Sequence, residues 1–474
     1  MNKPISRRNF LKLAGGAVVT VTGASLLPQF LRKTLMPDQV VAGALEPYDL
    51  FFAGTDGWFH LPTGPSVDSP YHPDSLAADA GPFTTYIFGF RNVTGLDDTQ
   101  RQNQRNKAQH NAPFFWVDQG ADFRLQLTNL GLALRPDLTD AHTLHWHGFR
   151  NVIPFYDGEP TGSISVMVGQ RFTYVYKPHD PGTYMYHCHV EDIEHVTMGM
   201  TGIVFVRPSQ NSSNTLKNLG TSRPAPNNKA YKGFAYNDGD ASTGYDREYP
   251  MFLSEIWLEG HWNDAHIQES QWYNFKADFS LLNGRVYPDT LLPNAPIDLA
   301  HSAYANGGKA LTIQTDANGD LLPPVGHPEL QYQPHSALVT CNAGERVLLR
   351  FASLGFREAS MTLAGINMKV VGRDATPMKG RDGSDTSYET DTLLMGAGES
   401  YDAIFTAPAF SGGSGSSGAG YDVYVLYNRR YTQDDDTANG TQGQRTEVRV
   451  YPASGPGARP PQAYFNQHPG DTAS

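Results

Sequence analysis

The sequence is poor in cysteine, in basic residues and in long apolar runs. Only two cysteines occur in 474 residues, which excludes a fold held together by a disulfide framework. Lysine and arginine number 36 against 48 aspartate and glutamate residues, and the net charge of −12 argues against a nucleic-acid partner, which requires a basic surface. Beyond the N-terminal segment, no stretch reaches the roughly 18 consecutive apolar residues that span a bilayer.

Glycine, proline and aromatic residues are abundant instead. The chain has 47 glycines, 33 prolines and 11% aromatic residues, and it shows no long amphipathic heptad pattern. This composition favours an all-β protein with many turns. A chain of this length is expected to form two or three domains.

The N-terminus has the layout of an export signal. Residues 6–12, Ser-Arg-Arg-Asn-Phe-Leu-Lys, resemble the twin-arginine signal, an apolar run covers residues 13–27, and residues 42–44, Ala-Gly-Ala, suit signal peptidase. We therefore expect residues 1–44 to be a twin-arginine signal peptide. This route exports proteins that fold beforehand, often around a cofactor, so we expect a soluble periplasmic, extracellular or cell-surface protein.

Apolar and polar residues alternate in two parts of the chain, which predicts two β-sandwich domains. Residues 123–129, Phe-Arg-Leu-Gln-Leu-Thr-Asn, show the clearest alternation. We expect a first domain over residues 45–208, beginning with an irregular N-terminal extension that runs to about residue 110. A linker over residues 209–248, a second domain over 249–452 and a flexible tail over 453–474 complete the expected organisation.

The segment from His187 to Met200 contains several candidate metal ligands. It reads Tyr-His-Cys-His-Val-Glu-Asp-Ile-Glu-His-Val-Thr-Met-Gly-Met from residue 186, so the thiolate of Cys188 is followed by the imidazole of His195 and the thioether of Met200. These are three of the four ligands of a blue-copper site, and the fourth, another imidazole, can come from residues 141–148. Met198 is the competing axial ligand, but Met200 directly precedes the next expected strand.

Four more histidines are placed on the opposite face of the same strands. His145 and His147 flank a tryptophan, and His187 and His189 flank Cys188. Because side chains alternate along a strand, each pair shares one face, and Cys188 points to the other. One face can therefore hold copper through the thiolate, while the other offers four imidazoles to further copper ions.

These motifs resemble the first domain of multicopper oxidases. The resemblance rests on residues 145–148 (His-Trp-His-Gly), 156–160 (Tyr-Asp-Gly-Glu-Pro) and 182–189 (Gly-Thr-Tyr-Met-Tyr-His-Cys-His). It implies cupredoxin-like Greek-key domains, bound copper, oxygen as the electron acceptor, and a small-molecule or metal-ion donor. It further implies that the type 1 copper ligands are His142, Cys188, His195 and Met200, that His145 takes a type 2 or type 3 position, and that His147, His187 and His189 take type 3 positions. Asp157 matches an acidic residue that relays protons near the cluster.

The chain departs from the family pattern in two ways. The interval from Cys188 to His195 is two residues longer than is usual. A trinuclear cluster needs eight histidines, whereas the second domain offers no paired histidines and resembles the copper-free middle domain of three-domain oxidases. Its histidines are isolated, at positions His261, His266, His301, His327 and His335. We expect Cys341 to be a buried packing thiol. We expect either a homo-oligomer in which a neighbouring chain supplies the missing ligands or an incomplete copper centre.

Two other functions fit the same residues. Copper nitrite reductases, which the chain resembles more loosely, use three histidines at the catalytic copper, and His145 and His187 can supply two of them. A non-catalytic blue-copper protein that transfers electrons needs only the Cys188 site. The 11 methionines are scattered and give no sign of a cuprous-ion donor.

Overall fold

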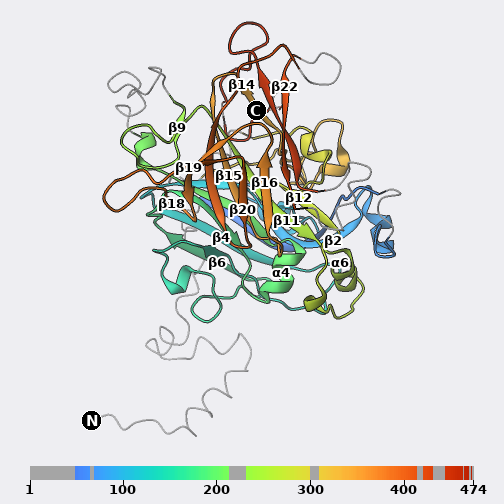
Figure 1. Ribbon diagram of the computed structural model, residues 1–474. Helices are drawn as coiled ribbons and strands as arrows, with labels where there is room; N and C mark the ends of the chain where they lie inside the picture. Colours follow the sequence, from blue (N-terminus) through green and yellow to red (C-terminus); the bar gives the residue numbers. More distant parts are fainter. Residues whose placement is uncertain are drawn as a thin grey trace, which may run out of the picture. The chain divides into compact units, whose positions relative to one another are not determined.

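A computed structural model describes residues 49–63, 69–212, 231–298, 309–413, 420–430, 443–462, 464–468 and 471. The expected signal peptide, residues 1–44, lies outside the described residues. Strands dominate the described residues, and they form two β-sandwiches, which confirms the all-β prediction (Figure 1). Within the described residues, no helix is long and apolar enough to span a membrane.

The first sandwich consists of a four-stranded sheet, in the order β2-β1-β4-β6, and a five-stranded sheet, in the order β13-β3-β8-β7-β5. Its strands are β1 (Leu50–Phe59), β2 (Thr85–Asn92), β3 (Phe115–Asp118), β4 (Phe123–Gly131), β5 (His145–His147), β6 (Arg171–Tyr176), β7 (Gly182–His187), β8 (Thr201–Arg207) and β13 (Lys309–Ala310). The alternation read from residues 123–129 is that of β4, where Phe123, Leu125 and Leu127 enter the core.

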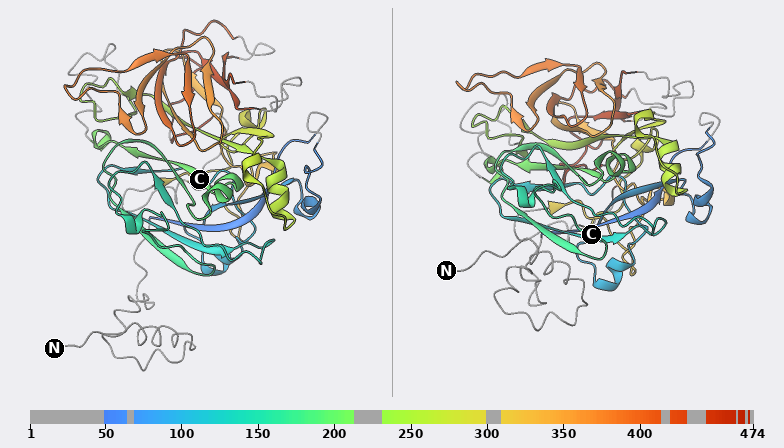
Figure 2. Two further views of the ribbon diagram at one scale, coloured as in Figure 1. Left: turned by 60° about the horizontal axis from the view of Figure 1, so that its bottom comes forward. Right: turned by 90° about the horizontal axis from the view of Figure 1, so that it is seen from below.

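The second sandwich pairs a seven-stranded sheet, in the order β12-β11-β15-β21-β17-β18 with β19 on β17, with a five-stranded sheet, in the order β14-β23-β22-β16-β20. Its strands are β11 (Arg247–Ile256), β12 (Phe279–Leu282), β14 (Val339–Asn342), β15 (Arg346–Ser353), β16 (Ala359–Leu363), β17 (Met368–Arg373), β18 (Thr376–Pro377), β19 (Tyr388–Thr390), β20 (Thr392–Met395), β21 (Ser400–Thr406), β22 (Asp422–Asn428) and β23 (Arg445–Tyr451). Figure 2 shows these strands, mostly in orange and red, gathered apart from the blue and green strands of the first sandwich.

Short elements connect the strands. The α-helices of the described residues are α3 (Asp98–Gln102), α4 (Asp192–Met198) and α6 (Leu258–Ala265), and a two-stranded sheet pairs β9 (Gly233–Phe234) with β10 (Gly244–Tyr245). The 3-10 helices are η2 (Ser75–Ala80), η3 (Pro154–Tyr156), η4 (Ser209–Ser212), η5 (Trp272–Asn274), η6 (Asp289–Leu291) and η7 (Pro328–Leu330). Helix α4 lies between Cys188 and β8, and therefore within the predicted copper loop.

We expected an irregular N-terminal extension, and this expectation is wrong. The extension contributes two strands, β1 and β2, to the first sandwich. Strand β1 pairs in parallel with β4 and antiparallel with β2, and every residue of β1 is buried. The alternation that reveals a half-exposed strand is missing because β1 is covered on both faces. Its glycines suggested a loop, but Gly54 and Gly57 lie where neighbouring side chains and backbone leave no room for a Cβ atom.

The expected flexible tail and the described part of the expected linker are packed as well. Phe465 is buried and packs edge-on against Trp116 of β3 and Phe205 of β8. In the linker region, the buried hydroxyl of Tyr236 donates a hydrogen bond of 2.6 Å to Asp402. Both segments therefore belong to the folded body, because their aromatic side chains fill space between the two sandwiches.

A buried ionic network connects the second sandwich to strand β7. Arg350 pairs with Glu248 at 2.6 Å and with Asp402 at 3.1 Å. Asp402 also accepts a hydrogen bond of 2.6 Å from the hydroxyl of Thr183 on β7, and Ser400 donates one of 2.7 Å to the Thr183 carbonyl. The second sandwich thus fixes the start of the strand that leads to Cys188.

Candidate metal centres

The structure brings His142, Cys188 and His195 together from three places in the first sandwich. His142 precedes β5, Cys188 directly follows β7, and His195 lies on α4. Their ligand atoms all lie within 4.8 Å of one another. The loop is closed by backbone hydrogen bonds, from the Cys188 amide to the Met200 carbonyl at 3.1 Å and from the Met200 amide to the His195 carbonyl at 2.9 Å.

The Cys188 sulfur is buried between two imidazoles. Its Sγ lies 3.1 Å from Nδ1 of His195 and accepts a hydrogen bond of 3.4 Å from the Thr143 amide. Burial by itself raises the pKa of the thiol, but His195 and His142 outweigh burial and hold this pKa well below its usual range. A thiolate is the form that binds copper.

Unpartnered ring nitrogens show that this donor set fits a metal ion. Both ring nitrogens of His142 are buried without a hydrogen-bond partner, and His142, Cys188 and His195 are fully shielded from solvent. A buried polar atom without a partner costs free energy, and coordination to a metal satisfies it. A thiolate with two imidazoles is the donor set of a blue-copper site.

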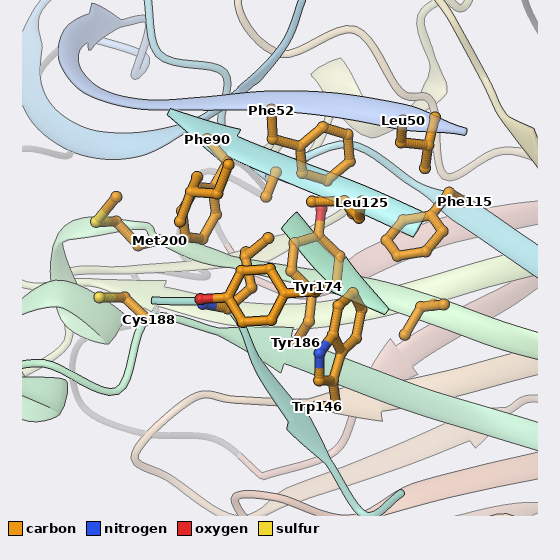
Figure 3. Packing of buried hydrophobic residues seen from close by; sticks show 14 of the residues in the cluster. Leu50, Phe52, Phe90, Phe115, Leu125, Trp146, Tyr174, Tyr186, Cys188 and Met200 are labelled. Atoms are coloured by element: carbon orange, nitrogen blue, oxygen red, sulfur yellow. The ribbon is translucent and has the colours of Figure 1, made fainter. Parts of the chain in front are cut away.

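The structure places Met200, the preferred axial ligand, beside His142. A Cβ atom on Gly54 of β1 would lie 2.7 Å from Cδ2 of His142 and 3.4 Å from Cε of Met200, so both side chains converge on this point. Figure 3 shows Cys188 and Met200 at one end of the aromatic core, with their sulfur atoms directed to the same side. A glycine at position 54 is therefore needed to leave room for the site.

The second histidine group lies where β5 and β7 pair. His145 lies opposite His187, and the ligand atoms of His145, His147 and His187 all lie within 4.8 Å of one another. The ring of His189 is adjacent, with its centroid 4.9 Å from that of His145, but His189 is not part of this close group. The structure thus brings three of the four predicted imidazoles to one point and places the fourth beside them.

Hydrogen bonds orient two of these rings. Nδ1 of His145 donates to the Asp157 carbonyl at 2.9 Å, and Nδ1 of His187 donates to the Cys188 carbonyl at 2.8 Å. Each bond leaves Nε2 available as a metal ligand and fixes the ring orientation, as outer partners of metal-binding histidines do. Trp146 and Tyr186, the neighbours of these histidines along the strands, point instead into the aromatic core (Figure 3).

Asp157 lies beside the histidine group rather than in it. Its Oδ1 is 3.6 Å from Nδ1 of His145. Burial raises the pKa of Asp157, and the neighbouring His145 acts in the opposite direction. The carboxyl is close enough to exchange a proton with this group, but its role in catalysis stays a prediction.

The isolated histidines that the structure describes in the second half of the chain belong to no candidate metal group, and most of them have a hydrogen-bond or ion-pair partner. His261 bonds to the Tyr86 carbonyl, His266 pairs with Asp74, His327 pairs with Glu329, and His335 stacks on Phe114. His301 lies outside the described residues. Cys341 is buried in the core of the second sandwich, as predicted for a packing thiol, and burial raises its pKa.

Family models agree with this geometry. Two models, both described as multicopper oxidase, match residues 92–211 and 254–414, together more than half of the chain. The chain belongs to the multicopper oxidase family. Its members are copper-dependent oxidoreductases, so membership favours an enzyme over the non-catalytic electron-transfer protein.

Two solved copper proteins are similar to this chain. The blue copper oxidase from Nitrosomonas europaea is 18% identical, with a TM-score of 0.50, over 84% of this chain and 85% of that chain. The copper nitrite reductase from the same organism is 14% identical, with a TM-score of 0.47, over 87% of this chain and 96% of that chain. No curated protein sequence matches this multicopper oxidase.

Several residues of this multicopper oxidase near the two groups were not found from the sequence. They are Gly54, Asp140, Glu194, Asp264 and Gly398. Asp140 and Glu194 lie close in sequence to predicted ligands, two residues before His142 and one residue before His195. Gly54, Asp264 and Gly398 come from distant elements, and their proximity to the site is a consequence of tertiary packing.

Proposed function

We propose that this multicopper oxidase removes single electrons from a donor at the Cys188 group and reduces dioxygen at the histidine group. The observation that carries the proposal is the covalent adjacency of the two groups. Cys188 belongs to one group and its neighbour His187 to the other, and their side chains lie on opposite faces of β7. An electron therefore has a short covalent path from one group to the other.

The ligand assignments follow the resemblance and the geometry. His142, Cys188, His195 and Met200 would hold type 1 copper, and His145, His147, His187 and His189 would hold copper of type 2 or type 3. Copper supplies a centre that changes its oxidation state by one electron and that binds oxygen where a coordination position is open.

The side chains of the protein would hold the ligands in place, exclude water and transfer protons. The first group is fully shielded from solvent, and its packed side chains would hold a bound copper with little rearrangement on electron transfer. The Asp157 and Cys188 carbonyls hold the rings of His145 and His187. Asp157 is the group that we propose to deliver protons to reduced oxygen, because its carboxyl lies 3.6 Å from His145.

A trinuclear cluster needs eight histidines, of which the first sandwich offers four. The described residues of the second sandwich do not supply the other four as paired histidines. Where paired histidines would be expected, on β16, the chain has Met361 in the hydrophobic core. We propose that a second copy of the chain completes the centre. Size measurement of copper-loaded protein tests this, and a strictly monomeric protein with a full cluster would contradict it.

Oxygen uptake by copper-loaded protein tests the proposed reaction. With a reduced phenolic donor, the native chain should consume oxygen, and Cys188→Ser should lose this activity because the serine hydroxyl does not replace the thiolate. Cys341→Ala, in the core of the second sandwich, is the matched control and should retain the activity. Absence of oxygen uptake from fully loaded native protein, with organic and with metal-ion donors, would refute the proposal.

A specific observation favours nitrite reduction as a second candidate. His145, His147 and His187 form a close group of three imidazoles, the number that a nitrite-reducing copper requires. Copper-loaded protein with a reduced donor and nitrite should release nitric oxide if this candidate holds. Oxygen uptake without nitric oxide would reject it.

We also propose that the chain is exported by the twin-arginine route, on the basis of residues 1–44. Replacement of Arg7 and Arg8 by lysine should retain the protein in the cytoplasm. Fractionation of cells that express the native and the replaced chain measures this, and equal export of both would contradict it.

A further inference from the structure

A cavity of about 300 Å³ lies outside the two candidate metal groups, and none of the residues that line it is a candidate copper ligand. Three parts of the chain line it: the segment between β9 and β10, the turn before β7, and an arm that comprises residues 369–387 and includes β18. They contribute, among others, Tyr236, Pro181 and Met378, respectively. Ligand pockets begin at about this volume, so the cavity is large enough for a small molecule.

The apolar part of the lining is held in place by the second sandwich. Tyr236 is buried, and its hydroxyl donates a hydrogen bond of 2.6 Å to Asp402, so a ligand meets the ring rather than the hydroxyl. A Cβ atom on Gly372 of β17 would overlap the Tyr236 hydroxyl oxygen, which shows how closely this side chain packs on the strand. Met378 is half-buried and offers a thioether, a group that packs favourably against aromatic rings.

The charged side chains of the lining neutralise one another. Asp238 is satisfied within its own turn and accepts hydrogen bonds from the Thr243 amide at 2.7 Å and from the Gln210 side chain at 2.8 Å. Each cation of the lining has a carboxylate near it: Arg150 pairs with Asp180 at 3.1 Å, Lys369 pairs with Asp385 at 3.2 Å, and Lys379 interacts electrostatically with Asp240. An ionic ligand would compete with these pairs, whereas a neutral ligand leaves them intact.

A turn of the arm connects the cavity to the histidine group. Ala375 lines the cavity, and both Asp374 and Ala375 have positive φ, 47° and 51°, a conformation that costs free energy in residues with a Cβ atom. The Asp374 amide donates to the Ser400 carbonyl at 2.9 Å, and the Ser400 amide donates to Oδ1 of Asp374 at 3.0 Å. Ser400 follows Gly398 by two residues, and Gly398 lies against the His147 ring. A molecule that contacts Ala375 therefore has a short hydrogen-bonded connection to a candidate copper ligand.

We propose that this cavity binds a neutral aromatic small molecule, and that its occupancy is coupled through Asp374 and Ser400 to copper binding at the histidine group. The thioether and the tyrosine ring suit an aromatic ligand, and cations at the edge of the cavity attract the face of an aromatic ring without requiring an anion. The coupling is reciprocal, because a copper ion that changes the affinity for the aromatic molecule has its own affinity changed by the same factor. Neither step involves electron transfer, so the site does not depend on the proposed oxidase function.

Equilibrium dialysis of the full-length chain against 2-naphthamide tests the site. This probe is neutral and aromatic and has no phenolic hydroxyl to oxidise, and the native chain should bind one molecule saturably. The anion 2-naphthoate has a similar size and should bind the native chain at least about tenfold more weakly, because it competes with the paired carboxylates.

A substitution that fills the cavity locates the bound probe. Met378→Trp should weaken the binding of 2-naphthamide at least about tenfold, because the indole occupies the space that the probe needs. Thr386→Trp is the matched control. Thr386 is exposed on the same arm, and its amide donates to the Met378 carbonyl at 3.1 Å, but it does not line the cavity. Thr386→Trp should change the affinity less than about twofold.

The same dialysis with copper-free and copper-loaded protein measures the coupling. The affinity of the native chain for 2-naphthamide should differ at least about fivefold between the two forms. Asp374→Gly suits the positive φ and removes the acceptor of the Ser400 amide, so it should retain binding and lose this difference. Asp382→Gly, on the same arm, removes a carboxylate that accepts from the Ser384 amide at 3.0 Å instead, and it should retain the difference.

Two sets of results would overturn the proposal. Absence of saturable 2-naphthamide binding, equal binding of 2-naphthoate, or equal binding by the native chain and Met378→Trp would overturn the site. Equal affinities of the copper-free and copper-loaded chains, or a difference that persists in Asp374→Gly, would overturn the coupling.

Discussion

The ring of His147 on β5 lies against Gly398, in the turn that leads into β21 of the second sandwich. A Cβ atom built on Gly398 would lie 3.1 Å from Nε2 of His147. The second sandwich therefore limits the space around the histidine group, because the backbone at Gly398 lies close to the His147 ring.

Replacement of Gly398 by alanine should disturb the histidine group and spare the Cys188 group. The new methyl group pushes the His147 ring by a few tenths of an ångström, so copper bound by histidine should fall while the blue absorption persists. Gly344→Ala is the control, since both glycines have positive φ but a Cβ on Gly344 meets nothing within 4 Å. Each variant should lose about 1 kcal/mol of unfolding free energy from backbone strain. Equal copper spectra for the two variants would show that the contact has no role.

Replacement of Met200 by leucine should raise the reduction potential of the type 1 copper and keep its blue colour. The axial thioether tunes the potential, and a hydrocarbon side chain removes this donor while it preserves the volume. Met198→Leu is the control, because Met198 is equally buried on the same loop. Redox titration of the blue absorption measures both. If the reduction potential shifts in Met198→Leu and not in Met200→Leu, Met198 rather than Met200 is the axial ligand.

Glu248→Gln should destabilise the junction between the sandwiches by about 3 to 5 kcal/mol at neutral pH, because it leaves buried arginine charges uncompensated. Burial raises the pKa of Glu248, but Arg207 and Arg350 outweigh burial and lower it to about 2. A carboxyl with a lowered pKa stabilises the fold above its unfolded pKa of about 4.3 and loses this contribution as the pH falls toward 2. Denaturant unfolding should therefore show the gap between native and variant chains narrowing from about pH 4 to pH 2. A gap that is constant with pH would contradict this account.

The candidate copper ligands were predictable because they follow from two short segments, residues 141–148 and 187–200, and from strand geometry. Alternation alone places Cys188 opposite His187 and His189, and the structure retains this arrangement. The spacing from Cys188 to Met200 identified the loop, although not the helix α4 inside it. Gly54 and the burial of β1 were missed, since a strand covered on both faces lacks alternation.

The long-range partners had no signal in the sequence. Asp264 and Gly398 approach His195 and His147 only after the two sandwiches pack, and no local pattern encodes such a contact. Phe465 was assigned to a tail because proline and glycine surround it, yet its ring fills a gap beside Trp116. The amino-acid composition of a segment indicates its local backbone preference. The positions of Asp264, Gly398 and Phe465 depend instead on how distant parts of the chain pack together.

Copper content together with electron paramagnetic resonance, in the native chain and in Cys188→Ser, tests the central claim most directly. We predict more than one copper per chain in fully loaded native protein, with a blue-copper signal and a separate signal from copper bound by histidine. In Cys188→Ser the blue signal should vanish while the histidine-bound copper remains. A single copper per chain, lost completely in Cys188→Ser, would contradict the account.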